Sequence, residues 1–222
     1  MLEAAARHAA ARGALLFRLD LAAELAGAAL TPFERGGGEL VAVADGDGYA
    51  VACVEEGLVP RLRCFVRFEG SGAQVTLDGS PAPPALEAMA AAKRAVARAG
   101  LVGARLPQAV LVVPPTEGAD ALQAYAVRLA SRAGDLVLGV HWRLGLSGDG
   151  RVLIRREPLG RAATVAAAGG RLPARIALAH QGACPNELHH YLSLKHGVAF
   201  DLLALESETR WRVEGEWSGV VG

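Results

Sequence analysis

Apolar and polar residues alternate along several stretches of the chain, and this period of two predicts β-strands. The clearest cases are Arg61–Phe68 and Leu136–Leu146, in which every second residue is apolar. Successive side chains of a strand face opposite sides of a sheet, so each pattern indicates a half-buried strand. Turns rich in glycine and aspartate at 45–48 and 147–150 join strands into two hairpins. Further strands are expected at Leu40–Ala44, Tyr49–Glu55, Gln74–Leu77, Ala109–Val113, Ala121–Leu129, Arg151–Glu157, Arg175–Ala179, Val198–Leu205 and Thr209–Glu214.

Helix-forming patterns occupy three segments of the chain. Residues 1–30 are rich in alanine, and Gly13 is predicted to divide them into two helices. Residues 85–99 gather their apolar side chains on one face, and Pro185 begins a short helix over 185–195. Because strands dominate and do not alternate regularly with helices, the sequence predicts an α+β fold with a mainly antiparallel sheet.

The proline-rich stretch Asp78–Pro84 is the best candidate for a linker. It predicts an N-terminal part with helices and strands, residues 1–80, and an α+β part, residues 85–222. The same stretch is also compatible with a long loop inside one domain.

Composition and charge narrow the functional classes. The 23 basic residues balance 23 acidic residues, and 52% of the 222 residues are hydrophobic. A folded chain is therefore expected, and the balanced charge argues against a general nucleic-acid binder or a protein of anionic membranes. No apolar run is long enough to span a membrane. Arg7 and Arg12 interrupt any signal-peptide core, which predicts a cytoplasmic protein, with export as the alternative if a signal peptide has been removed.

The densest group of reactive side chains lies at residues 180–196, which hold four of the six histidines. If Pro185 is the first helical residue, Cys184 or Ala183 is the N-cap, where the helix dipole lowers the pKa of a thiol. His180 or His189 could then act as the base for a cysteine nucleophile. The alternative is that Cys184 is a small buried apolar residue.

A metal site is a second interpretation of the same segment. Glu187 and His190 stand three residues apart, and His180, Cys184 and His189 also have ligand chemistry. The spacing matches no established ligand pattern, so metal binding remains open. The catalytic candidates are therefore His180, Cys184, Glu187 and His189, and no cofactor motif is present.

Two other polar features have simple explanations. Arg61, Arg63 and Arg67 share one strand face, which could bind an acidic partner but is more typical of a solvated face. His141 and Arg143 lie on the opposite strand face from Trp142. They could be functional if that face lines a groove, but polar residues on such a strand are more typically expected to meet water.

The second half of the chain resembles a known family over about residues 105–205. The matching segments are Val112–Pro115, Gly139–Arg143, Ser147–Arg151, Arg156–Arg161 and the helix Pro185–His196. They are similar to an uncharacterised family of proteobacterial proteins with a Pro-x-Glu-[Leu/Ile]-His-x-x-Leu-Ser-Leu-Lys-His helix motif. The resemblance implies no established activity. It implies a site at Glu187 and His189 rather than at Cys184, and it keeps export as an alternative.

Two functions follow as hypotheses. The leading one is a soluble binding or interaction protein of unassigned role that uses the sheet and the 185–196 helix, with an unknown protein partner or self-association. It rests on the lack of a complete catalytic constellation. The alternative is a hydrolase-type enzyme, metal-dependent or Cys/His, centred on residues 180–196.

Overall fold

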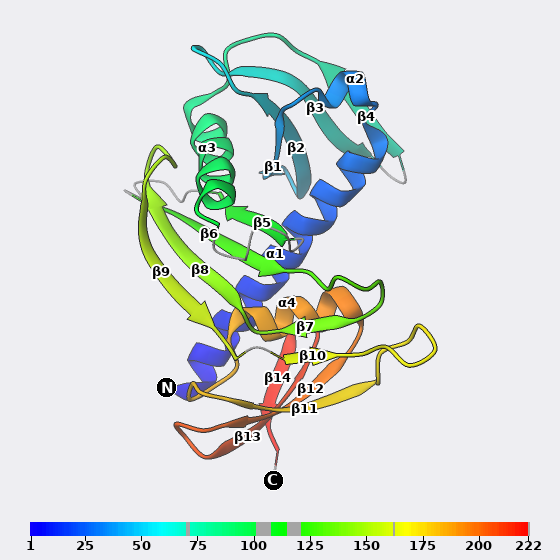
Figure 1. Cartoon of the computed structure of the whole chain (residues 1–222), viewed down its shortest axis with the longest axis vertical. Coiled ribbons are helices and arrows are strands. Elements are labelled where there is room, and N and C mark those ends of the chain that lie inside the picture. The colour runs from blue at the N-terminus through cyan, green and yellow to red at the C-terminus, as the bar shows by residue number, and fades with distance from the viewer. Residues whose placement is uncertain (70–71, 101–107, 115–120, 162, 222) are drawn as a thin grey trace. The chain divides into compact units, whose positions relative to one another are not determined.

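The computed structural model describes residues 1–69, 72–100, 108–114, 121–161 and 163–221 (Figure 1). It confirms an α+β fold dominated by mainly antiparallel sheets. Contacts divide the chain into two compact units, each assembled from distant segments. Unit 1 holds Met1–Phe17, Arg128–His141 and Pro158–Gly222, and unit 2 holds Arg18–Val127 and Trp142–Glu157. The domain boundary expected near residues 80–85 stays a prediction, because compactness alone does not show which part folds independently.

The helices are α1 (Leu2–Ala29), α2 (Pro32–Arg35), α3 (Pro84–Arg98) and α4 (Glu187–His196). The predicted break at Gly13 is wrong, because α1 continues through it. A Cβ atom at Gly13 would stand 2.5 Å from His190 Cβ and 2.6 Å from the carbonyl oxygen of Glu187. The glycine therefore allows α1 and α4 to approach closely within unit 1. No helix of the described chain is long and apolar enough to cross a membrane.

Unit 2 contains an antiparallel sheet and most of a second sheet. The first sheet has the order β1 (Glu39–Asp45), β2 (Gly48–Glu55), β3 (Arg61–Glu69), β4 (Gly72–Leu77). The second has the order β5 (Gln108–Val113), β6 (Ala121–Arg128), β8 (His141–Ser147), β9 (Leu153–Leu159). Helix α3 contacts β1, β2 and β5. Its buried residues Leu86, Met89 and Val96 join Val41 and Leu122 in one apolar core.

The arginine face of β3 is occupied by partners within unit 2. Arg63 donates to the carbonyl oxygen of Phe33 at 2.6 Å, Arg67 pairs with Asp45 at 2.9 Å, and Arg61 donates to a backbone carbonyl at 2.7 Å. Each of the three arginines therefore has a partner inside unit 2.

Unit 1 is built on a sheet with the order β11 (Arg175–His180), β12 (Ala199–Ala204), β13 (Thr209–Glu214), β14 (Trp217–Val220). Strands β11 and β12 pair in parallel, whereas β12 with β13 and β13 with β14 pair antiparallel. Helix α4 connects the two parallel strands and lies against β12 and β13 (Figure 1). This crossover is the connection that parallel neighbours require. A short antiparallel pair, β7 (Leu136–Leu138) with β10 (Ala163–Val165), completes the unit's strands in the described chain.

The prediction of one long strand over Leu136–Leu146 is wrong, because the strand is interrupted between β7 and β8. Gly139 has a φ of 81° and Val140 a φ of 55°, both in the left-handed region. A Cβ atom at Gly139 would overlap the carbonyl group of Arg161, so only glycine fits there. This interruption changes the face of the sheet to which the following side chains point. As a result, His141 is only 1% exposed. The expectation that His141 meets water is therefore also wrong.

Candidate functional site

A cavity of about 220 Å³ lies entirely within unit 1. Strand β11, the start of α4, the β7–β8 break, residues 159–161 and residue 163 surround it. Its apolar lining includes Leu138, Leu159, Leu178, Leu188 and Leu192, and its polar lining includes His141, His180, His189 and Arg161. The cavity thus brings together His180 and His189, which the sequence predicts as site residues, and His141, which the sequence offers only as an alternative. It also includes Arg161, which no sequence pattern singled out.

Asn186, not Cys184 or Ala183, is the N-cap of α4. Its Oδ1 accepts hydrogen bonds from the backbone N–H groups of Leu188 at 3.1 Å and His189 at 3.3 Å. Asparagine satisfies these otherwise unpaired amides far better than alanine or cysteine does. Pro185 therefore precedes the cap, and the predicted placement of Cys184 at the helix terminus is wrong.

His189 completes the cap and also faces the cavity. Its Nδ1 accepts the backbone N–H of Asn186 at 3.1 Å, which places the proton of a neutral ring on Nε2. Burial holds the pKa of His189 well below its usual value, and His180 lowers it further. The two rings meet edge to face, with centroids 4.7 Å apart and an interplanar angle of 81°.

His141 is held from both sides of its ring. Nδ1 accepts the backbone N–H of Arg128 at 3.1 Å, and Nε2 lies 3.2 Å from the carbonyl oxygen of Val137, to which it donates in this tautomer. Burial lowers the pKa of His141 to about 4. The sequence held one signal for this break in the strand. Gly139 interrupts the alternating pattern, and a glycine inside a strand often marks a bulge or a close approach of another backbone.

His180 gives the cavity a third uncharged imidazole. Burial lowers its pKa, opposed in part by a hydrogen bond to the backbone of Cys184 and by the charge of Glu206. At neutral pH the rings of His141, His180 and His189 are therefore uncharged. Their ring atoms and the leucines form a weakly polar wall.

Arg161 supplies positive charge to the cavity lining. Its side chain is exposed, as is that of Gln181. With the Gln181 amide oriented so that its oxygen faces the guanidinium, Oε1 accepts from Arg161 Nη2 at 2.8 Å and from Nε at 3.3 Å. This contact orients the guanidinium without neutralising its charge.

Cys184 lacks the environment of an activated nucleophile. Partial burial raises the pKa of its thiol, and the charge of Glu206 raises it further. The expected lowering by the helix dipole is wrong because Asn186 occupies the terminal amides of α4. A reactive cysteine needs an environment that favours the thiolate, and this one favours the thiol.

Glu187 is buried at the start of α4 and does not line the cavity. Its side chain is 5% exposed, and its charge raises the pKa of His190 against the effect of burial. His190 Nδ1 lies 2.8 Å from the carbonyl oxygen of Gly215. Within the described residues, no group of three or more His, Cys, Asp or Glu side chains is arranged to hold a metal ion.

Comparisons with protein-family models, curated proteins and solved structures gave no match to this chain. The candidate site therefore rests on its geometry. That geometry is an apolar cavity with three uncharged imidazoles and one guanidinium.

Proposed function

We propose that unit 1 is a binding module for a small, mainly apolar molecule that carries a carboxylate. The observation that supports this proposal is the composition of the cavity: leucines and uncharged imidazoles line it, together with the exposed guanidinium of Arg161. Small-molecule sites are typically concave and mostly apolar, with a few polar groups that fix orientation.

The cavity defines the ligand by size and charge. Its volume of about 220 Å³ suits a short hydrocarbon or a single ring. Burial of such a body contributes roughly 25 cal/mol for each Å² of apolar surface removed from water. A carboxylate can accept two parallel hydrogen bonds from the Arg161 guanidinium. The Nε2–H group of His189 is a further donor, since its Nδ1 is already used as an acceptor.

The hydrolase alternative has less support. The raised pKa of Cys184 opposes a thiolate nucleophile, and the rings of His180 and His189 meet edge to face. A protein partner or self-association remains a prediction for the rest of the surface.

Calorimetric titration with octanoate tests the proposal, with octan-1-ol and octylamine as probes of the same length. We expect octanoate to bind more tightly than either. Arg161→Gln should weaken octanoate binding about tenfold, equivalent to about 1.4 kcal/mol, and leave octan-1-ol unchanged. Arg175→Gln is the matched control, because Arg175 is an exposed arginine of β11 outside the cavity.

A pocket-filling variant distinguishes the cavity from other apolar surfaces. Ala179 lines the cavity and is exposed, so Ala179→Trp should block all three probes without disturbing the core. Octanoate binding that survives both Ala179→Trp and Arg161→Gln would contradict the proposal, as would the absence of octanoate binding.

A further inference from the structure

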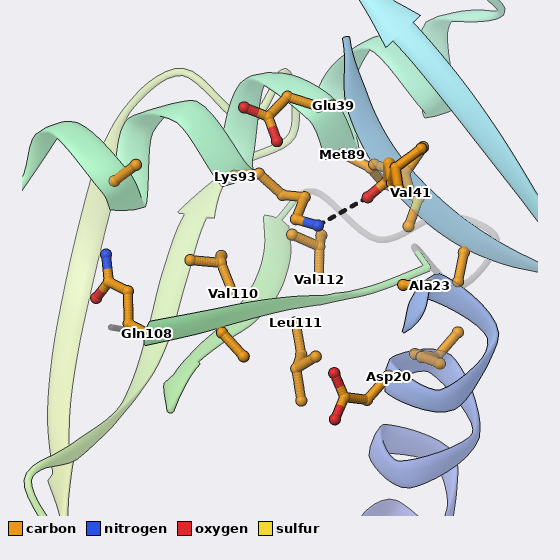
Figure 2. A pocket seen from close by; sticks show the side chains of 15 residues that line it. Asp20, Ala23, Glu39, Val41, Met89, Lys93, Gln108, Val110, Leu111 and Val112 are labelled. Atoms are coloured by element: carbon orange, nitrogen blue, oxygen red, sulfur yellow. Dashed lines mark hydrogen bonds between the residues drawn. The ribbon is translucent and has the colours of Figure 1, made fainter. Parts of the chain in front are cut away.

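A second cavity, of about 290 Å³, lies within unit 2 between α1, α3, β1 and β5 (Figure 2). Met89, Val110, Leu111 and Val112 form much of its apolar lining. Three ionisable side chains also line it: Asp20 from α1, Glu39 from β1 and Lys93 from α3. None of these residues belongs to the binding site proposed for unit 1.

Lys93 carries its amine into this cavity (Figure 2). It shares a helix face with Met89 and Val96, both buried in the core of unit 2. Its Nζ donates to the carbonyl oxygen of Leu40 at 2.7 Å. Burial lowers the pKa of the Lys93 amine, whereas the charges of Glu39 and Asp20 oppose that shift. The net effect enlarges the fraction of amine that has a free lone pair.

The composition of the chain adds to the significance of this amine. Lys93 and Lys195 are the only lysines, and every other basic side chain except the histidines is an arginine. A guanidinium can hold a carbonyl oxygen or pair with a carboxylate, but it stays protonated and is a poor nucleophile. The chemistry that lysine alone supplies at position 93 is nucleophilic addition by a neutral amine.

We propose that Lys93 forms an imine with a small aldehyde or ketone bound in the unit 2 cavity. The Nζ lone pair attacks the carbonyl carbon, so a C–N bond forms as the C=O π bond breaks, and one proton passes from the nitrogen to the oxygen. The resulting carbinolamine then loses water: the C–O bond breaks, the oxygen leaves with the second proton of the nitrogen, and the C=N bond forms. The step needs no oxidant or reductant.

The surroundings of Lys93 suit each part of this reaction. The charges of Glu39 and Asp20 both act on the amine, and they would stabilise the positive charge of a protonated imine. The apolar side chains of Val110 and Val112 limit access of the water that would hydrolyse the imine. A ligand with a short hydrocarbon body fits the cavity volume.

Reductive trapping with butanone and cyanoborohydride at pH 7 tests the proposal on the full chain. After proteolysis, mass spectrometry measures the rate at which Lys93 and Lys195 each acquire the butyl adduct. We expect Lys93 to react at least about tenfold faster than Lys195, because the lowered pKa leaves more of its amine neutral and the cavity holds the ketone beside it. In urea, which removes the cavity, the two rates should become equal.

Matched arginine variants locate the reaction. Lys93→Arg keeps the positive charge and the donors to Leu40, and it should abolish the fast adduct, whereas Lys195→Arg should leave it unchanged. Equal or slower labelling of Lys93 in the folded wild-type protein would overturn the proposal. That comparison needs no variant, so the result stands even if Lys93→Arg folds poorly.

Discussion

The imidazole of His189 and the side chain of Asn186 cap the first turn of α4 reciprocally. Asn186 Oδ1 accepts the His189 backbone N–H at 3.3 Å, and His189 Nδ1 accepts the Asn186 backbone N–H at 3.1 Å. The same imidazole lines the unit 1 cavity. The hydrogen bonds that fix the start of α4 therefore also fix the orientation of the His189 ring in the cavity wall. The stability of the helix and the proposed ligand binding both depend on this one side chain.

Variants at position 189 separate these two roles. His189→Ala removes the acceptor for Asn186 and leaves a void, so we expect the free energy of unfolding to fall by about 2 kcal/mol. Glutamine commonly fills this third helical position in reciprocal caps, and His189→Gln should restore about half of the loss. Urea unfolding followed by circular dichroism measures both. Equal losses in the two variants would contradict the capping role.

Unit 1 should lose stability in mild acid, and His141 should contribute strongly to that loss. Its pKa is lowered from 6.5 to about 4 in the folded protein. Between these values the unfolded chain binds a proton that the folded chain does not, so stability falls as the pH drops through this window. The stabilisation is fully present above pH 6.5. The maximal loss is about 3 kcal/mol, from 1.36 kcal/mol per pKa unit.

Denaturant unfolding at a series of pH values checks this expectation. His141→Gln removes one of the buried histidines of unit 1, so it should make the decline between pH 6.5 and pH 4 shallower. The lowered pKa values of His180 and His189 should maintain the rest of the decline. His8→Gln is the control, since His8 is exposed on α1 and should leave the slope unchanged. An identical slope in wild type and His141→Gln would show that another group causes the acid sensitivity.

Two glycines of α1 should respond oppositely to alanine. Alanine favours a helix over glycine by about 1 kcal/mol, so Gly27→Ala should be stabilising, as its Cβ would stand 3.7 Å from Leu40 Cδ1. Gly13→Ala would force a methyl group against His190 and the Glu187 carbonyl, so we expect a net destabilisation of about 2 kcal/mol. Thermal unfolding of the two variants makes the comparison. A stabilised Gly13→Ala protein would mean that α1 and α4 do not pack closely.

The parts of the fold that sequence patterns predicted are those in which burial follows a local period. Strand β3 and helix α3 lie where the alternating and helical patterns placed them. Their buried faces are set by neighbouring positions along the chain. The parallel pairing of β11 with β12 was not predicted, because pairing partners distant in sequence leave no local signal.

The candidate site was less predictable because it depends on distant contacts. The need for Gly139 arises from the Arg161 carbonyl, and the need for Gly13 from α4. His141 enters the cavity only through the break after Gly139. Asn186 is recognisable from the sequence, since asparagine is a preferred N-cap, but Pro185 competes with it as a signal for the helix start.

Thiol reactivity tests the environment of Cys184 directly. Cys53 and Cys64 are 0% exposed, and burial raises the pKa of Cys53 to about 11, so neither should react with iodoacetamide in the folded protein. Cys184 is partly exposed and should be alkylated first. Its raised pKa should make it slower than the thiol of glutathione at pH 7.5, because the thiolate is the reacting species.

Mass spectrometry of tryptic peptides over time gives the three rates. In urea the three cysteines should react alike, and Cys184→Ser should remove the early adduct from the folded protein. If Cys184 instead reacts faster than glutathione, its thiol is activated in solution. The Cys/His hydrolase would then regain its main requirement, a nucleophile that is ionised at neutral pH.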